Sequence, residues 1–146
     1  MARVSPPRRA GRKCICGLSE KRSLIAVPPL AAPTMNAPEC PLEVTPEEAC
    51  ALVKAHPGQC LILDVREPHE LEICRVAGSD SVPMGQVPAL LTTLPRDRHL
   101  LVLCHHGGRS RRVTQFLRAQ GFTTVTNIAG GIEAWACQVD PKLARY

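Results

Sequence analysis

Aromatic residues are scarce in this sequence, and long apolar stretches are missing. The 146 residues include one Trp, one Tyr and two Phe, too few for the stacking platforms on which single-stranded nucleic acids bind. No apolar run approaches the roughly 20 residues that a membrane-spanning helix needs. These absences argue against a nucleic-acid-binding protein and against a protein embedded in a membrane.

Acidic residues are nearly missing from the N-terminal part of the chain. Residues 1–34 carry seven Lys or Arg and a single acidic residue, Glu20, whereas residues 35–146 carry eleven Lys or Arg and twelve Asp or Glu. The formal net charge of +5 therefore comes from the N-terminal part, and the remainder is close to neutral. A neutral globular part lacks the broad basic face of a nucleic-acid-binding surface.

The N-terminal stretch is rich in proline and arginine and shows no hydrophobic periodicity. We predict a disordered extension over residues 1–38 and one folded domain over residues 39–146. The apolar run at 24–27 is short and is followed by two prolines, so it resembles a targeting segment only weakly. A true translation start at Met35 is an alternative explanation. Cys14 and Cys16 have no second pair of ligands nearby in the sequence, so this segment does not favour a zinc site.

The chain has eight cysteines at irregular spacings. Cys50, Cys60, Cys74 and Cys137 fall within apolar runs, and we predict that they are free thiols packed as small buried apolar side chains. Free thiols indicate a reducing compartment, and a cytoplasmic location is expected.

Strand-like and helix-like patterns alternate from residue 42 onward. Thr45, Pro46 and Glu48 form a helix start with a capping box. The predicted strands are 42–44, 60–65, 81–83, 99–103 and 122–128; the predicted helical segments are 46–55, 68–73, 87–94, 110–120 and 132–135. This order predicts an α/β domain, a small parallel sheet with helices on both faces, whose ligands bind beyond the carboxyl ends of the strands.

The sequence Cys104-His105-His106-Gly107-Gly108-Arg109-Ser110 joins a predicted buried strand to a predicted helix. Backbone N–H groups of such a loop, with the helix N-terminus, stabilise an anion. A thiolate held there is a nucleophile, so Cys104 is the candidate catalytic residue and the rest of the loop the candidate substrate-binding site. A metal site is not predicted, because adjacent histidines do not converge easily on one ion with Cys104.

Several other residues of the candidate site have two interpretations. Arg109 either attracts an anionic donor or braces the loop by pairing with a carboxylate such as Asp64 or Glu67. His105 and His106 either contact donor oxygens or shape the rim of the site. Three further residues either support the loop or line the mouth of the site: Asp64, Arg66 and Arg75. A supporting role is favoured for Asp64.

Four segments together resemble the rhodanese family of single-domain sulfurtransferases. They are the Cys104–Ser110 loop, Asp64-Val65-Arg66-Glu67, the segment from Val76 to Pro83, and the segment from Asn127 to Trp135. The resemblance implies a rhodanese-like fold without cofactor or metal. It also implies that Cys104 takes a sulfur from a donor such as thiosulfate, forms a persulfide, and passes the sulfur to cyanide, a thiol or a sulfur-relay protein.

Two other functions are compatible with parts of this pattern. A cysteine phosphatase or arsenate reductase of the same fold type also uses a cysteine loop, but it normally has five residues between cysteine and arginine. Four residues separate Cys104 from Arg109 here, which favours a smaller cargo such as a sulfur atom. The second alternative is a rhodanese-like module that carries or binds sulfur with little turnover.

Overall fold

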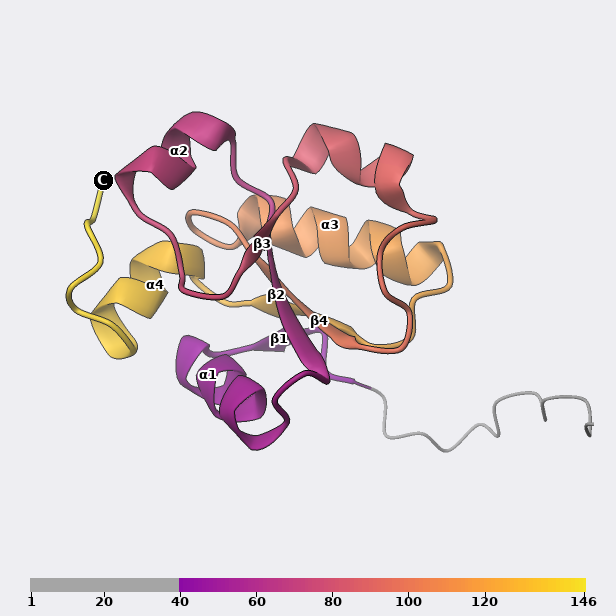
Figure 1. Cartoon of the computed structure of the whole chain (residues 1–146), viewed down its shortest axis with the longest axis horizontal. Helices are drawn as coiled ribbons and strands as arrows, with labels where there is room; N and C mark the ends of the chain where they lie inside the picture. The colour runs from indigo at the N-terminus through magenta and orange to yellow at the C-terminus, as the bar shows by residue number, and fades with distance from the viewer. Residues whose placement is uncertain (1–39) are drawn as a thin grey trace, which may run out of the picture. The chain divides into compact units, whose positions relative to one another are not determined.

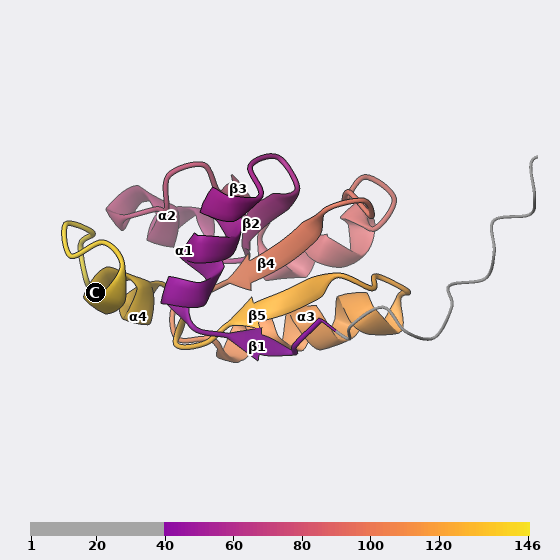
Figure 2. The ribbon, with the colours of Figure 1, turned by 90° about the horizontal axis from the view of Figure 1, so that it is seen from below.

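A parallel five-stranded sheet forms the centre of the computed structural model, which describes residues 40–146. The strands lie in the order β1-β5-β4-β2-β3, and every neighbouring pair is parallel. Figure 2 shows β1, β4 and β5 pointing the same way. The strand bounds are β1 (Glu43–Val44), β2 (Cys60–Asp64), β3 (Asp80–Ser81), β4 (His99–Leu103) and β5 (Val125–Ile128). The predicted α/β fold with a parallel sheet is confirmed.

Helices cover both faces of the sheet, because alternate residues of its central strand point to opposite sides. Leu100 and Val102 of β4 belong to a core shared with α3 (Gly108–Ala119) and the 3₁₀ helix η1 (Met84–Leu90). Leu101 and Leu103 belong to a second core on the other face, shared with α1 (Pro46–Ala55) and α4 (Gly131–Gln138). The remaining helix, α2 (Pro68–Ile73), lies near the C-terminal end of the chain (Figure 1).

Local sequence signals explain where α1 and α3 begin and end. Thr45 caps α1, with its hydroxyl accepting from the N–H of Glu48 at 3.2 Å and the Glu48 carboxylate accepting from the N–H of Thr45 at 2.8 Å. The predicted capping box is confirmed. After α3, the N–H of Phe122 bonds the carbonyl of Leu117 at 3.1 Å, a Schellman motif. Phe122 therefore closes α3, and β5 begins three residues later than predicted.

Other predicted boundaries also differ from the structure. The apolar stripe at 87–94 is not an α-helix: η1 ends at Leu90 and contains Pro88, which has no N–H to continue an α-helical hydrogen-bond pattern. The predicted brief strand at 81–83 is β3 at Asp80–Ser81. The last helix runs on to Gln138, past the predicted end at Trp135, and its Ala136 is buried along with Ile132 and Trp135.

The six cysteines of the described part of the chain are all free. Cys74 is buried, as predicted, and Cys50 and Cys60 are half-buried. The prediction for Cys137 is wrong, because this residue is exposed near the end of α4. The predicted extension at 1–38, Met35, Cys14 and Cys16 lie outside the described residues. Within residues 40–146, no helix has the length and apolar character to cross a membrane.

Candidate active site

Cys104 directly follows β4 and is 1% exposed. Its Sγ accepts a hydrogen bond from the N–H of Gly107 at 3.0 Å and lies 3.2 Å from the Ser110 hydroxyl, which donates to it. Helix α3 starts at Gly108, within the same loop, so the positive end of its dipole adjoins the sulfur. These donors stabilise a negative charge on Cys104, which is the condition for a thiolate nucleophile.

Gly107 gives the loop a shape that other residues do not readily adopt. Its φ is +95°, in the left-handed region, and a Cβ added to it would lie 3.0 Å from the backbone nitrogen of Gly130. The tight turn directs the N–H of Gly107 at the sulfur of Cys104. A glycine is therefore required here by both conformation and space.

The start of α4 holds the loop from the other side. The N–H of Ile132 donates to the carbonyl of Cys104 at 2.8 Å, and that of Glu133 donates to the carbonyl of His105 at 3.2 Å. Gly131 has a φ of +60°, and a Cβ there would overlap both carbonyl oxygens. The segment around Gly131, which the sequence marked as part of the family resemblance, is thus a backbone clamp on the cysteine loop.

Arg109 braces the loop, as one of its two interpretations predicted, but its partner is Glu70 of α2 rather than Asp64 or Glu67. The two guanidinium nitrogens lie 2.7 and 2.6 Å from the two carboxylate oxygens of Glu70. These hydrogen bonds lower the pKa of Glu70 to about 2, against the opposing effect of burial. The three-residue spacing from Glu67, the N-cap of α2, marks Glu70 as a capping residue of that helix, but it does not identify Arg109 as its partner.

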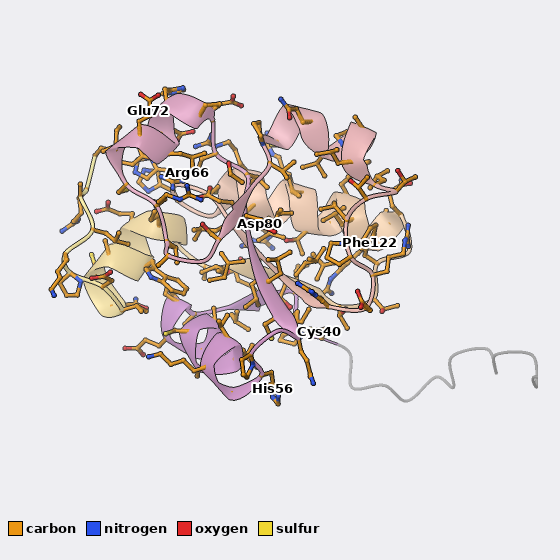
Figure 3. The ribbon with its side chains drawn as sticks, viewed as in Figure 1. Cys40, His56, Arg66, Glu72, Asp80 and Phe122 are labelled. Carbon is orange, nitrogen blue, oxygen red and sulfur yellow. The ribbon has the colours of Figure 1, made fainter. Side chains whose placement is uncertain are left out.

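Asp64 and Arg66 form a buried ion pair at the end of β2, and both are 0% exposed. The Arg66 Nη2 is 2.6 Å from an Asp64 oxygen and 2.9 Å from the carbonyl of Cys74. Burial alone would lower the pKa of Arg66, but the hydrogen bonds and charges of Asp64 and Tyr146 together outweigh that effect and raise it. Figure 3 shows Arg66 beyond the carboxyl end of β2. The prediction that Arg66 lines the mouth is wrong, because its guanidinium is enclosed and engaged.

The two histidines of the loop take different positions. His105 is half-buried and its ring lies between those of His106 and Tyr146, at centroid distances of 3.8 and 4.2 Å. Burial, and then the charge of His106, lower the pKa of His105. His106 is exposed. Neither side chain forms a hydrogen bond with the Cys104 sulfur in the described structure. Both histidines therefore lie at the rim of the site.

Tyr146 joins the site although nothing in the sequence indicated it. Its hydroxyl accepts from Arg66 at 2.9 Å and donates to Glu70 at 3.2 Å. Burial raises the pKa of this phenol, which keeps the proton that it donates. Tyr146 therefore links the buried ion pair to the Glu70–Arg109 pair while its ring covers His105. No local pattern could reveal a contact made across 76 residues of sequence.

Two predicted residues contribute less directly. Arg75 is exposed and bonds the carbonyl of Ser79 at 3.2 Å, which places it on the segment after α2. Gly108 begins α3, and a Cβ added to it would meet nothing within 4 Å. Among residues 40–146, no group of three or more His, Cys, Asp or Glu side chains is arranged to hold a metal ion.

Comparison with known proteins identifies the family of this chain. The model of the rhodanese-like domain matches residues 45–138. The chain is 40% identical over 89 residues to the chloroplastic rhodanese-like/PpiC domain-containing protein 12 of Arabidopsis thaliana, which covers 58% of this chain but 30% of that protein. It is 32% identical over 92 residues to the thiosulfate sulfurtransferase GlpE of Stutzerimonas stutzeri, covering 63% of this chain and 82% of that protein.

A solved structure of similar fold is the rhodanese-related protein of Thermoplasma volcanium, with a TM-score of 0.60 and 29% identity. The likeness covers 66% of this chain and 92% of that protein. The region matched by the family model contains strands β2 to β5, the Cys104 loop and the α4 clamp. The chain therefore belongs to the rhodanese-like domain family.

Proposed function

We propose that this protein is a sulfurtransferase that carries a sulfur atom on Cys104 as a persulfide. The observation that carries the proposal is the pair of hydrogen-bond donors on the Cys104 sulfur, the N–H of Gly107 and the hydroxyl of Ser110. Both groups are fixed before the reaction, so they stabilise a sulfur anion without reorganising during it.

The transfer consists of two displacements at sulfur. In the first, the Cys104 thiolate attacks the outer sulfur of thiosulfate, the S–S bond of thiosulfate breaks, and sulfite leaves with its electron pair. In the second, an acceptor such as cyanide attacks the terminal sulfur of the persulfide, thiocyanate leaves, and the thiolate is restored. A nucleophile that forms a covalent intermediate divides the transfer into two easier steps.

The donor and acceptor are proposed from chemistry and from relatives. The name of the Stutzerimonas stutzeri relative specifies thiosulfate as a substrate of that protein. Arg111 and Arg112 are exposed near the start of α3 and would attract a dianionic donor to the loop. A cellular thiol or a sulfur-relay protein would serve as acceptor, and the free thiols favour a reducing, cytoplasmic location.

The position of Arg109 favours sulfur transfer over phosphate chemistry. A phosphatase needs a guanidinium free to bind a tetrahedral anion above the cysteine, and Arg109 instead makes a two-point pair with Glu70. A bidentate pair of this kind is the strong form of such an interaction. The loop thus offers the anion its backbone N–H groups and the Ser110 hydroxyl.

Mass spectrometry after treatment with thiosulfate tests the proposal. We expect a gain of about 32 Da, the mass of one sulfur atom, on the peptide that contains Cys104. The gain should be lost in Cys104→Ser and kept in Cys137→Ser, a matched control at an exposed thiol. A sulfur adduct that persists on Cys104→Ser would overturn the assignment of the nucleophile.

Turnover distinguishes the remaining functions. An enzyme should convert thiosulfate and cyanide to sulfite and thiocyanate repeatedly, and its kcat/KM should fall as salt screens Arg111 and Arg112. A sulfur carrier would form the persulfide without multiple turnovers. Hydrolysis of an aryl phosphate faster than thiocyanate formation would instead establish the phosphatase alternative.

A further inference from the structure

A second cysteine makes close polar contacts far from Cys104. The Cys40 sulfur lies 3.0 Å from Nε2 of His99 and 3.2 Å from the Thr126 hydroxyl, which are themselves 2.9 Å apart. His99 is the first residue of β4, whereas Cys104 follows its last. The two thiols therefore lie at opposite ends of the same strand, and Figure 3 shows Cys40 near the amino end of β2.

Cys60 adds another thiol to this group. It is the first residue of β2 and the register partner of His99 on β4. Register partners on adjacent strands extend from the same face with their Cβ atoms about 5 Å apart. Burial first, and then the charge of Cys40, raise the pKa of Cys60. Cys40 and Cys60 are both neighbours of His99, the first through its side chain and the second through the strand register.

The imidazole of His99 is placed to accept a proton from Cys40, because its Nε2 lies 3.0 Å from the Cys40 sulfur. Burial and then the positive charge of Arg118 lower the pKa of His99, which keeps its imidazole neutral near pH 7. Arg118 donates to the carbonyls of Cys40 at 2.6 Å and Pro41 at 2.8 Å. The same guanidinium therefore fixes the backbone of Cys40 and favours a negative charge in this neighbourhood.

We infer that Cys40 and Cys60 form a second reactive thiol site, at which His99 takes the proton of Cys40 and a hydroperoxide is the substrate. Two thiols beside a base match a two-electron oxidant, because the first accepts the oxygen and the second completes a disulfide. Both cysteines are half-buried, so a small peroxide can reach them.

The reaction has two balanced steps. The Cys40 sulfur attacks one peroxide oxygen, the O–O bond breaks, and His99 returns the proton to the leaving oxygen; with hydrogen peroxide the products are a sulfenic acid and water. The Cys60 thiol then attacks the Cys40 sulfur, a disulfide forms, and a second water leaves. The two thiols lose two electrons in total, and the peroxide gains them.

The test uses the full chain carrying Cys104→Ser, which removes the other reactive sulfur. The protein is treated with hydrogen peroxide at pH 7, remaining thiols are alkylated, and each cysteine is followed by peptide mass spectrometry. We expect a Cys40–Cys60 disulfide to form at least about tenfold faster than Cys50 or Cys137 is oxidised. Cys50 is the control for a half-buried thiol and Cys137 for an exposed one.

Two variants separate the roles of the groups. His99→Gln should slow oxidation of Cys40 about tenfold without changing Cys50 or Cys137, and Cys60→Ser should stop the reaction at a sulfenic acid on Cys40. If His99→Gln does not fold, the inference is tested by the oxidation rates of Cys40, Cys50 and Cys137 in the chain that keeps His99. Oxidation of Cys40 no faster than that of Cys137, or a disulfide from Cys40 to Cys14 or Cys16, would overturn the inference.

Discussion

The two ends of the central sheet hold their cysteines in different ways. At the carboxyl end, the Cys104 sulfur receives a backbone N–H and a hydroxyl, and glycines shape the loop around it. At the amino end, the Cys40 sulfur contacts the imidazole of His99 and the hydroxyl of Thr126. One thiol depends chiefly on backbone geometry and the other on a side chain that can accept a proton.

The difference indicates which kind of chemistry each end can support. Fixed N–H donors hold a charge that persists, as in a thiolate or a persulfide, and they do not titrate. An imidazole can move a proton during a reaction, but its effect changes with pH. Two ion pairs, Asp64–Arg66 and Glu70–Arg109, brace the carboxyl end, and the amino end has no ion pair of this kind among the described residues.

The largest effect is expected from breaking the buried ion pair. Asp64→Asn leaves the enclosed Arg66 guanidinium without its counter-ion, and we expect a loss of about 3–5 kcal/mol in the free energy of unfolding. His99→Gln, the matched change at the amino end, should cost about 1 kcal/mol because it removes neutral hydrogen bonds. Urea denaturation measures both. Equal costs would show that the two ends are not braced differently.

Gly131→Ala tests the backbone clamp at the carboxyl end. The added Cβ would overlap the carbonyls of Cys104 and His105, in a backbone conformation unfavourable for alanine. We expect a loss of about 2–3 kcal/mol in stability and of persulfide formation on Cys104. Gly108→Ala is the control, since it has open space and an ordinary φ, and it should retain both. Full persulfide formation in Gly131→Ala would exclude the clamp as a requirement.

Acid should weaken the Glu70–Arg109 pair and the contacts of His99 over different pH ranges. Glu70 has a pKa of about 2 in the folded protein against an ordinary 4.5, so its stabilisation is complete above about pH 5 and is lost as pH falls toward 2. Because Arg109 is one-third exposed, we expect about 2 kcal/mol. His99, whose folded pKa is also lowered, loses its contribution as pH falls below about 6.5.

Urea unfolding across pH separates these contributions. Glu70→Gln should flatten the curve between pH 5 and 2 and leave the upper range unchanged, whereas His99→Gln should flatten the curve just below pH 6.5. A Glu70→Gln curve parallel to the unchanged protein at low pH would show that the pair with Arg109 contributes nothing to acid stability.

Local sequence patterns predicted much of the fold and the centre of the site. The capping box at Thr45, the bounds of β4 and α2, and the placement of Cys104 beyond a buried strand follow from signals within a few residues. Each of these features is fixed by the conformation of a short segment and by its apolar periodicity.

The features that sequence reasoning missed are contacts between distant segments. Arg109 meets Glu70 across 39 residues, Tyr146 meets Arg66 across 80, and Cys40 meets His99 across 59. Such partners depend on how the strands are ordered in the sheet, which no local pattern encodes. The error at Arg66 has the same origin: a charged residue after a strand is usually solvated, and here Asp64 and the carbonyl of Cys74 enclose it.

The smallest effect is expected at Tyr146, which connects the charged groups of the carboxyl end. Tyr146→Phe removes the hydroxyl between Arg66 and Glu70 but keeps the ring on His105, so we expect a loss of about 0.5–1 kcal/mol in stability. Tyr146→Ala also removes the ring and should increase the rate at which iodoacetamide alkylates Cys104, while leaving alkylation of Cys40 unchanged. Equal changes in the alkylation rates of Cys104 and Cys40 would mean that Tyr146 stabilises the whole domain. A residue that covers only the carboxyl end of the sheet should not alter the exposure of a thiol at the amino end.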